Sequence, residues 1–430
     1  MSTIAAITTA AGRSALAVIR LSGERAKEIG KQVFKPFPAS PNLIKHGKID
    51  CGGYYDDAML AYFDAPHSFT GEDTVEIYCH GGVGVPYAIL QTLLLRGAVL
   101  AQKGEFSKRA FINGKLDMAE TEGIIDVIEA QSAAQIKAGI MLKDSVLSKK
   151  IQSFQEELKS LLAEMEAMLD YPEEDLEIEG LPAIERRTGE IRDKVEKLFL
   201  TSKSGKMIKY GAKVVLFGRV NAGKSSLLNA LLSEERAIVS DEEGTTRDVI
   251  TQEVNYKDAR IIFTDTAGIR QAEGKVEKLG VERSYKAAEQ ADVVLNVSDC
   301  EDFLAVNSSA PVIRVRAKSD LMKKGENTAA DIAVSAKNMK NIEELKEEIY
   351  KKLDIENALS GAVVTNDRHI NVLARAKEEL AAAEESCKIS TADIVAENLR
   401  CAWKTLGEIS GKTASSDIIE EVYKRFCLGK

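Results

Sequence analysis

The stretch GRVNAGKS at residues 218–225 decides the fold of the middle of this chain. It has the glycine and lysine spacing of a phosphate-binding loop, and it lies between the apolar run 214–217 and a leucine-rich run at 227–232 with helical spacing. A strand, a glycine-rich loop and a helix in this order are the context that such a motif requires. The stretch therefore predicts the first strand, loop and helix of an α/β nucleotide-binding domain.

Three more segments follow in the order typical of a guanine-nucleotide switch. They are GTTRD at 244–248, DTAG at 265–268 and SAK at 335–337. The first of them, taken alone, fits a surface turn as well as a switch loop, because its composition is that of a turn. The ordered set favours a domain that binds and hydrolyses GTP.

The chemistry of phosphate binding suggests a role for each polar residue of these segments. Lys224 is expected to reach the terminal phosphates, and the Ser225 hydroxyl is expected to ligate magnesium. Thr246 is the switch residue that joins the magnesium shell only while the γ-phosphate is present. Asp265 follows a strand-like run, so it should lie at the carboxyl edge of a parallel sheet and hold magnesium through water. The Gly268 N–H can then meet the γ-phosphate.

The base-reading segment departs from the usual N-K-x-D pattern. AKSD at 317–320 keeps Lys318, which can pack along the base, and Asp320, which can accept from the guanine ring N–H and amino group. Ala317 replaces the asparagine, and the missing amide removes one hydrogen bond worth about 0.5–1.5 kcal/mol. We still expect the nucleotide to be GTP and not ATP. The predicted nucleotide contacts are Asn221, Ala222, Gly223, Lys224, Ser225, Ser226, Ser240, Asp241, Glu242, Glu243, Gly244, Thr245, Thr246, Asp265, Thr266, Ala267, Gly268, Lys318, Asp320, Ser335, Ala336 and Lys337.

Composition indicates an ordinary globular protein, with 44% hydrophobic and 29% charged residues and a formal net charge of −9. No apolar run approaches the ~20 residues of a membrane-spanning helix, and the start lacks the features of a signal peptide, so we expect a cytoplasmic protein. The six cysteines form no C-x-x-C pair and the four histidines are spread apart. These spacings predict reduced thiols and no structural metal site. The net charge implies no bulk attraction to nucleic acid, so an RNA partner would need a local basic patch.

Four segments are predicted along the chain. Residues 1–116 combine short strands with two helical stretches and indicate an α+β domain, and 117–207 have helical periodicity. The switch segments occupy 208–353 in β-α alternation, and 354–430 are helical again. Helical segments on both sides suggest a GTPase domain inserted into one helical domain. Three independent domains in series remain the alternative. Strands of the GTPase domain are expected at 214–217, 261–264, 293–297, 312–315 and 332–334.

Several short segments outside the GTPase set carry a family likeness. They are TIAA at 3–6 with GR at 12–13, IRLSG at 19–23, GEDTVE at 71–76 with HGG at 80–82, GEFS at 104–107, RAFINGKLD at 109–117, YPEED at 171–175 and FCLGK at 426–430. With them, the chain resembles along nearly its whole length the MnmE (TrmE) family of tRNA-modifying GTPases. Departures from the family pattern are Ala317, Val220 where proline is usual, and Ala10 and Ala11 where prolines are usual.

The resemblance implies a homodimer whose N-terminal domain binds a tetrahydrofolate derivative, 5-formyl- or 5,10-methylene-tetrahydrofolate. Arg20, Glu76 and Lys115 match the family's folate-contacting positions, with Lys430 near the same pocket. A carboxylate such as Glu76 suits the N–H edge of a pterin, and cations suit the glutamate tail. Taken alone, Arg20 and Lys115 fit ordinary surface charges, since such residues are mostly exposed.

The family works with an FAD-dependent partner, MnmG (GidA), in a hetero-oligomer. Together they add an aminomethyl or carboxymethylaminomethyl group to carbon 5 of the wobble uridine of certain tRNAs. The helical domain of the family presents a C-terminal cysteine, here Cys427, close in sequence to Lys424, Arg425 and Lys430. Neighbouring cations would lower the pKa of this thiol and favour the reactive thiolate. An idle thiol at the chain end is the alternative.

No built-in arginine finger is evident, so the charge that develops on the transferring phosphoryl group needs another cation. In the family this cation is potassium, and the matching ligands here are Asn221, Ser240, Glu242 and Thr245. The family orients the attacking water with a glutamate beyond DTAG, and Glu277 takes that place. Without the resemblance, Glu277 beside a lysine would fit a solvated helix charge.

A second interpretation of the whole chain stays open. A ribosome-assembly or signalling GTPase could carry flanking domains that only bind RNA or protein. GEDTVE at 71–76, NGKLD at 113–117 and CLGK at 427–430 favour the modifying enzyme, because a pure switch needs neither a folate pocket nor a terminal thiol.

Overall fold

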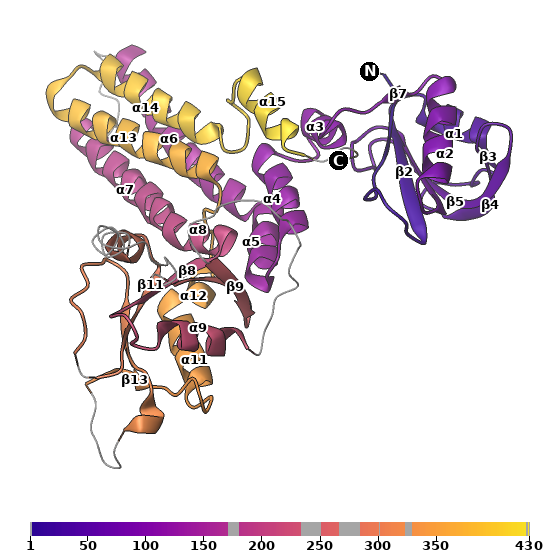
Figure 1. The fold of residues 1–430 in the computed structure, drawn as a ribbon. Helices are drawn as coiled ribbons and strands as arrows, with labels where there is room; N and C mark the ends of the chain where they lie inside the picture. Colours follow the sequence, from indigo (N-terminus) through magenta and orange to yellow (C-terminus); the bar gives the residue numbers. More distant parts are fainter. Residues whose placement is uncertain are drawn as a thin grey trace, which may run out of the picture. The chain divides into compact units, whose positions relative to one another are not determined.

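The protein is described by a computed structural model covering residues 2–170, 180–233, 251–265, 284–300, 302–322, 329–426 and 429. The chain forms two compact units, residues 1–125 with 407–430, and residues 126–406. Each unit is described separately below, with its helices and strands labelled as in Figure 1.

The first unit is an α+β domain that also holds the C-terminal segment. Its elements are β1 (Ile4–Ile7), β2 (Leu16–Ser22), α1 (Ala26–Val33), β3 (Phe34–Lys35), β4 (Lys45–Asp50), β5 (Tyr55–Phe63), β6 (Thr74–His80), α2 (Gly84–Leu95), β7 (Val99–Leu100), α3 (Glu105–Ile112), α4 (Met118–Glu129), which runs into the second unit, and α15 (Ser416–Lys424). The strands form a seven-stranded sheet in the order β3-β4-β5-β6-β2-β1-β7. Three helices, α1, α2 and α3, stand where two helical stretches were expected before residue 117.

The two faces of this sheet differ in chemistry. Apolar side chains on one face, such as Ile19 and Ile77, pack with residues of α1 and α2 into one buried core (Figure 1). Strand residues alternate between faces, so Arg20 and Glu76 point away from that core. The opposite face is therefore the one that can present polar groups to a ligand.

The C-terminal segment packs against the start of the helical region within the same unit. Val422, Tyr423 and Phe426 form a buried apolar cluster with Met118. The rings of Tyr423 and Phe111 lie 6.2 Å apart between centroids. The end of α15 is thus held close to α3 and α4.

The second unit contains a helical bundle and an α/β domain. Its helices are α5 (Ala133–Lys143), α6 (Val146–Asp170), α7 (Leu181–Leu200), α8 (Ser202–Tyr210), α9 (Lys224–Leu232), η1 (Ser319–Leu321), α11 (Ile342–Leu353), α12 (Ile355–Ala358), α13 (Asp367–Ile389) and α14 (Ala392–Gly407). The α6 helix ends at Asp170, just before the Tyr171-Pro172 pair, because a proline disfavours helical backbone at the residue before it.

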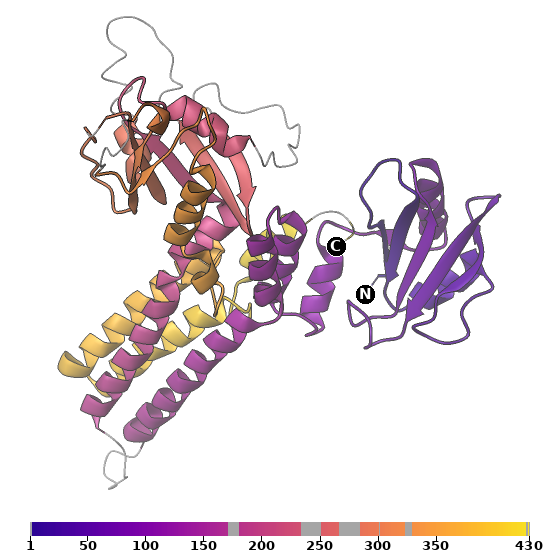
Figure 2. The same ribbon diagram turned by 90° about the horizontal axis from the view of Figure 1, so that it is seen from below.

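Helices from before and after the α/β domain pack side by side. Gln155 of α6 donates to the Trp403 carbonyl of α14 at 2.9 Å, and the Lys377 ammonium of α13 lies 5.1 Å from the Phe199 ring centroid of α7. Figures 1 and 2 both show α6 and α7 beside α13 and α14. The α/β domain is therefore inserted into one helical domain. The helices before and after it do not form separate domains, as the alternative of three independent domains in series would require.

The inserted domain has an α/β sheet, as predicted for the GTPase domain. Its strands are β8 (Ala212–Phe217), β9 (Thr251–Tyr256), β10 (Ala259–Asp265), β11 (Val293–Ser298), β12 (Val312–Arg316) and β13 (Ile332–Ala333). They lie in the order β13-β12-β11-β8-β10-β9, and β9 pairs antiparallel with β10 while the other pairs are parallel. All five predicted strands are confirmed, and β9 was missed.

Two further expectations concern membranes and cysteines. Within the described residues, no helix combines the length and apolar character needed to cross a bilayer. Cys51, Cys79, Cys300, Cys387 and Cys401 are free thiols, as expected, and Cys427 lies outside the described residues.

Candidate functional site

The phosphate-binding loop leaves the carboxyl end of β8 at the centre of the sheet. Strands that follow β8 in sequence lie on both sides of it, which makes its end the topological switch point where α/β folds bind ligands. Gly218 and Gly223 have positive φ angles of 150° and 98°. A Cβ atom at Gly218 would lie 2.1 Å from the Val297 carbonyl oxygen, so only glycine fits there. The loop geometry thus matches the prediction from GRVNAGKS.

Lys224 begins α9, the helix that follows the loop, and its side chain is buried. Its ammonium donates to the carbonyls of Gly218 and Arg219, each at 2.7 Å. The cation is thereby held inside the loop whose N–H groups and helix N-terminus favour a phosphate. Ser225 and Ser226 follow in the first turn and are exposed.

The base-reading loop lies directly against the phosphate loop. A Cβ atom at Gly223 would lie 3.3 Å from the Cβ of Ala317, which is 4% exposed. Lys318 has φ 55°, and its ammonium donates to the Asn221 carbonyl at 2.9 Å. Asn221 and Lys318, predicted from different motifs, are therefore in contact.

The carboxylate that would read guanine is fixed by the SAK segment. The buried Ser335 hydroxyl donates to Asp320 Oδ1 at 2.6 Å, and this hydrogen bond lowers the pKa of the Asp320 carboxyl. Ala336 and Lys337 follow it, half-buried and exposed. The structure therefore brings AKSD at 317–320 and SAK at 335–337 together.

The structure describes only some of the remaining predicted switch residues. Asp265 ends β10 and pairs in register with Leu216 of β8, so its backbone reaches the same sheet edge as the phosphate loop. The other predicted contacts lie outside the described residues: Ser240, Asp241, Glu242, Glu243, Gly244, Thr245, Thr246, Thr266, Ala267, Gly268 and Glu277.

Restoring the amide at position 317 gives the first testable prediction. Because Ala317 faces Gly223, Ala317→Asn places an amide where it can hydrogen-bond the loop and the base, and GTP and GDP should bind up to about tenfold more tightly. Fluorescent-nucleotide titration measures this. Ala317→Leu, of similar size without polar atoms, is the matched control and should not tighten binding. Unchanged affinity in Ala317→Asn would mean that the contact is supplied elsewhere.

A second polar site lies on the sheet of the first unit. Arg20 of β2 and Glu76 of β6 are opposite each other in register, and the guanidinium donates to Glu76 Oε1 through Nε at 2.9 Å and lies 2.8 Å away through NH2. Tyr78 donates its hydroxyl to Glu76 Oε2 at 2.6 Å, and burial together with this carboxylate raises the pKa of Tyr78 to about 12. The rings of Phe69 and Phe106 lie 5.3 Å and 5.7 Å from the Arg20 guanidinium.

One more predicted folate contact, Lys115, lies in the described part of the same unit. Lys115 donates to the Pro66 carbonyl at 3.0 Å and lies against Gly71, so it joins the segment that carries Phe69. Lys430 lies outside the described residues. A Cβ atom at Gly429 would lie 2.7 Å from the Ile7 carbonyl, so Gly429 lies beside β1, the strand that pairs with β2.

A buried ion pair joins two of the segments that carry the family likeness, GEDTVE at 71–76 and RAFINGKLD at 109–117. Arg109, which is 4% exposed, donates to both oxygens of Glu72 at 3.1 and 3.0 Å and to Glu105 at 2.8 Å. This fastens α3 to the loop before β6. Tyr78, Phe69, Phe106 and Arg109 were missed as site residues, because only the strand register and the fold of that loop reveal their neighbours.

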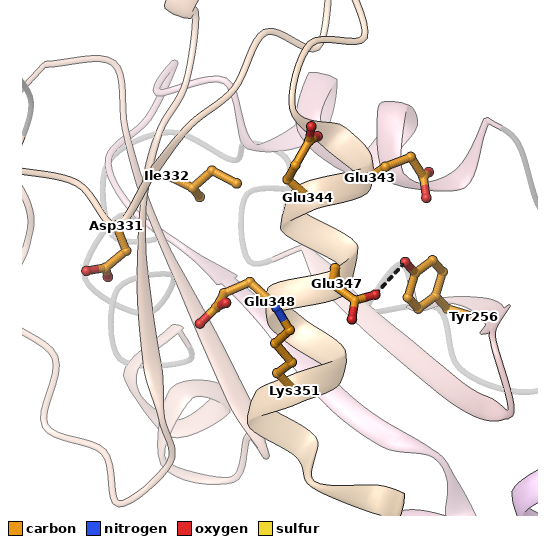
Figure 3. Close-up of a pocket in the computed structure, with 8 residues that line it drawn as sticks. All are labelled: Tyr256, Asp331, Ile332, Glu343, Glu344, Glu347, Glu348 and Lys351. Carbon is orange, nitrogen blue, oxygen red and sulfur yellow. Dashed lines mark hydrogen bonds between the residues drawn. The ribbon is translucent and has the colours of Figure 1, made fainter.

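A cavity of about 630 Å³ on the inserted domain lies elsewhere. Figure 3 shows Glu343, Glu344, Glu347 and Glu348 of α11 around it, with Asp331 opposite. Four of these carboxylates have basic partners: Glu343 pairs with Lys346, Glu347 with Lys257, Glu348 with Lys352 and Asp331 with Arg314. The residues that line the cavity do not include the phosphate loop or the base-reading loop, so the cavity is separate from the candidate nucleotide site.

The chain is similar to known proteins along its whole length. The family model for the GTP-binding protein TrmE N-terminus matches residues 3–115, and that for the MnmE helical domain matches residues 118–427. A tRNA modification GTPase MnmE of Clostridioides difficile is 37% identical over 459 residues, covering 100% of this chain and 99% of the relative. One of Lactococcus lactis subsp. lactis is 38% identical over 448 residues, covering 100% and 98%.

Solved structures give weaker likenesses. A GTP-binding protein of Sulfolobus solfataricus in complex with GDP matches 60% of this chain and 80% of its own at 16% identity and a TM-score of 0.25. The cytosolic domain of the T. maritima FeoB iron transporter matches 50% and 96% at 20% identity and a TM-score of 0.22. Likenesses this distant add nothing to the argument from the site.

Proposed function

The chain belongs to the MnmE family of tRNA modification GTPases, and we propose that its GTP hydrolysis drives modification of carbon 5 of the wobble uridine. It binds GTP and hydrolyses it in tRNA modification. We propose further that a tetrahydrofolate derivative donates the one-carbon unit, and that an FAD-dependent partner of the MnmG type completes the enzyme around a homodimer. We expect this tRNA modification to take place in the cytoplasm, where its tRNA substrates are.

The Arg20–Glu76 pair is the observation that carries this proposal. A switch-only GTPase, the alternative interpretation, has no use for a partly buried ion pair set among Phe69, Phe106 and Tyr78. A pterin is planar and polar at one edge, so it suits aromatic rings beside a carboxylate. Glu76 Oε2 accepts from Tyr78 and keeps further acceptor capacity, since an ionised carboxylate offers about four lone-pair sites.

At the nucleotide site, each residue has a role in proposed hydrolysis. Lys224 would hold the terminal phosphates, and Ser225 with Thr246 would hold magnesium, which would neutralise the charge that develops during phosphoryl transfer. Asn221, Ser240, Glu242 and Thr245 would hold potassium, which supplies the charge that an arginine finger supplies elsewhere. The exposed oxygens of Asn221 and Ser225 are chemically suited to such hard cations.

Glu277 would orient the attacking water, and Cys427 would act in the tRNA chemistry. Both lie outside the described residues, so their roles rest on their place in the sequence.

Removing the carboxylate of Glu76 tests the folate site. Glu76→Ala should cost roughly 1–3 kcal/mol of 5-formyltetrahydrofolate binding, because ligand donors are left unpaired in a partly buried site. Calorimetric titration of the full chain measures this loss. Asp57→Ala removes an exposed carboxylate of the neighbouring strand β5 and should leave folate binding unchanged. Unaltered binding in Glu76→Ala would remove Glu76 from the site.

Replacing Cys427 tests the proposed thiol chemistry. Cys427→Ser keeps the shape of the side chain and removes the thiolate, so folate and GTP binding should be spared while wobble-uridine modification falls. Mass spectrometry of nucleosides from tRNA of cells carrying the variant measures modification. Cys401→Ser is the control, because Cys401 is a free thiol within the described residues, and cells with this variant should modify their tRNA normally. Full modification by Cys427→Ser would show that the terminal thiol takes no part.

A further inference from the structure

The ammonium of Lys318 is held from two sides. It donates to the Asn221 carbonyl at 2.9 Å and to Asp299 Oδ2 at 2.7 Å. Asp299 follows β11, so its carboxylate and the phosphate loop lie at the same edge of the sheet. The hydrogen bond from Lys318 lowers the pKa of the Asp299 carboxyl, which therefore stays ionised at neutral pH.

The stem of Lys318 crosses the phosphate loop between these contacts. A Cβ atom at Gly223 would lie 3.8 Å from Lys318 Cε. In a guanine-nucleotide site this apolar stem is the part that packs along the base, while the ammonium needs polar partners beyond it. Asp299 and the Asn221 carbonyl supply those partners before any nucleotide arrives.

This arrangement matters more here because of Ala317. An asparagine at that position could hydrogen-bond the phosphate loop, but Ala317 has no side-chain donor or acceptor. Lys318, in contrast, does contact the phosphate loop, through its hydrogen bond to the Asn221 carbonyl. A lysine side chain that is free to rotate loses much rotamer entropy when ligand binding fixes it. A lysine already held in place loses less, which favours binding through pre-organisation.

We propose that Asp299 is a positioning residue for guanine-nucleotide binding, which stretches Lys318 across the phosphate loop so that its stem is ready for the base. Asp299 acts through Lys318 and need not touch the nucleotide. The pair is 40% exposed on each side, so solvent weakens it in the free protein, and a bound base would shield it. The proposal rests on GTP binding and is independent of folate and potassium.

A double-mutant cycle on the full chain tests this proposal. Asp299→Asn keeps the size of the side chain and removes its charge, and it should weaken GTP and GDP binding about two- to fivefold. Turnover at saturating GTP should stay the same, because the loss concerns binding and not the transition state. In a Lys318→Met background, Asp299→Asn should have no further effect, since its target is gone.

Asp302→Asn is the matched control, because Asp302 is an exposed carboxylate on the same stretch that pairs with Arg219 instead. It should change affinity less than Asp299→Asn does. Three results would each overturn the proposal: unchanged affinity in Asp299→Asn, an equal loss in the Lys318→Met background, or an equal loss in Asp302→Asn. A fall in turnover at saturating GTP would point to a general structural role and would also overturn it.

Discussion

Replacing potassium by sodium should lower GTP turnover by about a thousandfold, at the low end of what losing a phosphoryl-stabilising cation costs. The exposed Asn221 stands in the phosphate loop with φ 64°, where its side chain can hold a cation beside the phosphates. A sodium ion is smaller and would not be held by the same oxygens at proper distances. Steady-state phosphate release in matched chloride salts measures the difference.

Variants at position 221 sharpen this test. Asn221→Ala should lose potassium activation, but alanine is strained at a positive φ. Asn221→Gly accepts that backbone and should lose activation equally. Val220→Ala, at a neighbouring residue that is 80% exposed, should keep it. Equal rates in sodium and potassium, or full activation of Asn221→Gly, would contradict the assignment.

Replacing Glu277 should abolish most turnover and leave GTP affinity nearly intact. A residue that orients water acts on the transition state and not on the ground state, so Glu277→Ala should cost about a hundredfold or more in kcat. Single-turnover hydrolysis and nucleotide titration on the same preparation separate the two effects.

Glu282→Ala, which removes a carboxylate of the same sequence segment, is the control and should hydrolyse GTP normally. If affinity and turnover fell together in Glu277→Ala, Glu277 would be a structural residue and the water would be oriented by another group.

The inserted domain could be predicted well because its central strands are rich in apolar residues. Val293–Ser298, for example, is apolar except at Asn296 and Ser298, and it is buried along its whole length, as expected of a parallel strand covered on both faces. β9 was missed because it is an edge strand in which Gln252, Glu253 and Asn255 dilute the apolar pattern. Edge strands are half-solvated, so hydrophobicity marks them poorly.

The second site illustrates a different limit. The family likeness points to Arg20 and Glu76, but only the pairing of β2 with β6 places them opposite each other. Nothing in the local sequence says that Tyr78 donates to Glu76, or that Asp299 holds Lys318, because register and loop conformation decide such contacts. Chemistry that depends on one motif could therefore be predicted, and contacts between motifs could not.

The central claim is that GTP hydrolysis by this chain serves wobble-uridine modification. Nucleoside analysis of tRNA from a strain lacking the chain, complemented with the intact protein or with Lys224→Ala, tests it most directly. We predict that the carbon-5 aminomethyl or carboxymethylaminomethyl uridine is lost in the deletion, restored by the intact protein, and absent with Lys224→Ala, whose phosphate loop lacks its cation. Unaltered wobble uridines in the deletion strain would contradict the account and favour a switch-only GTPase.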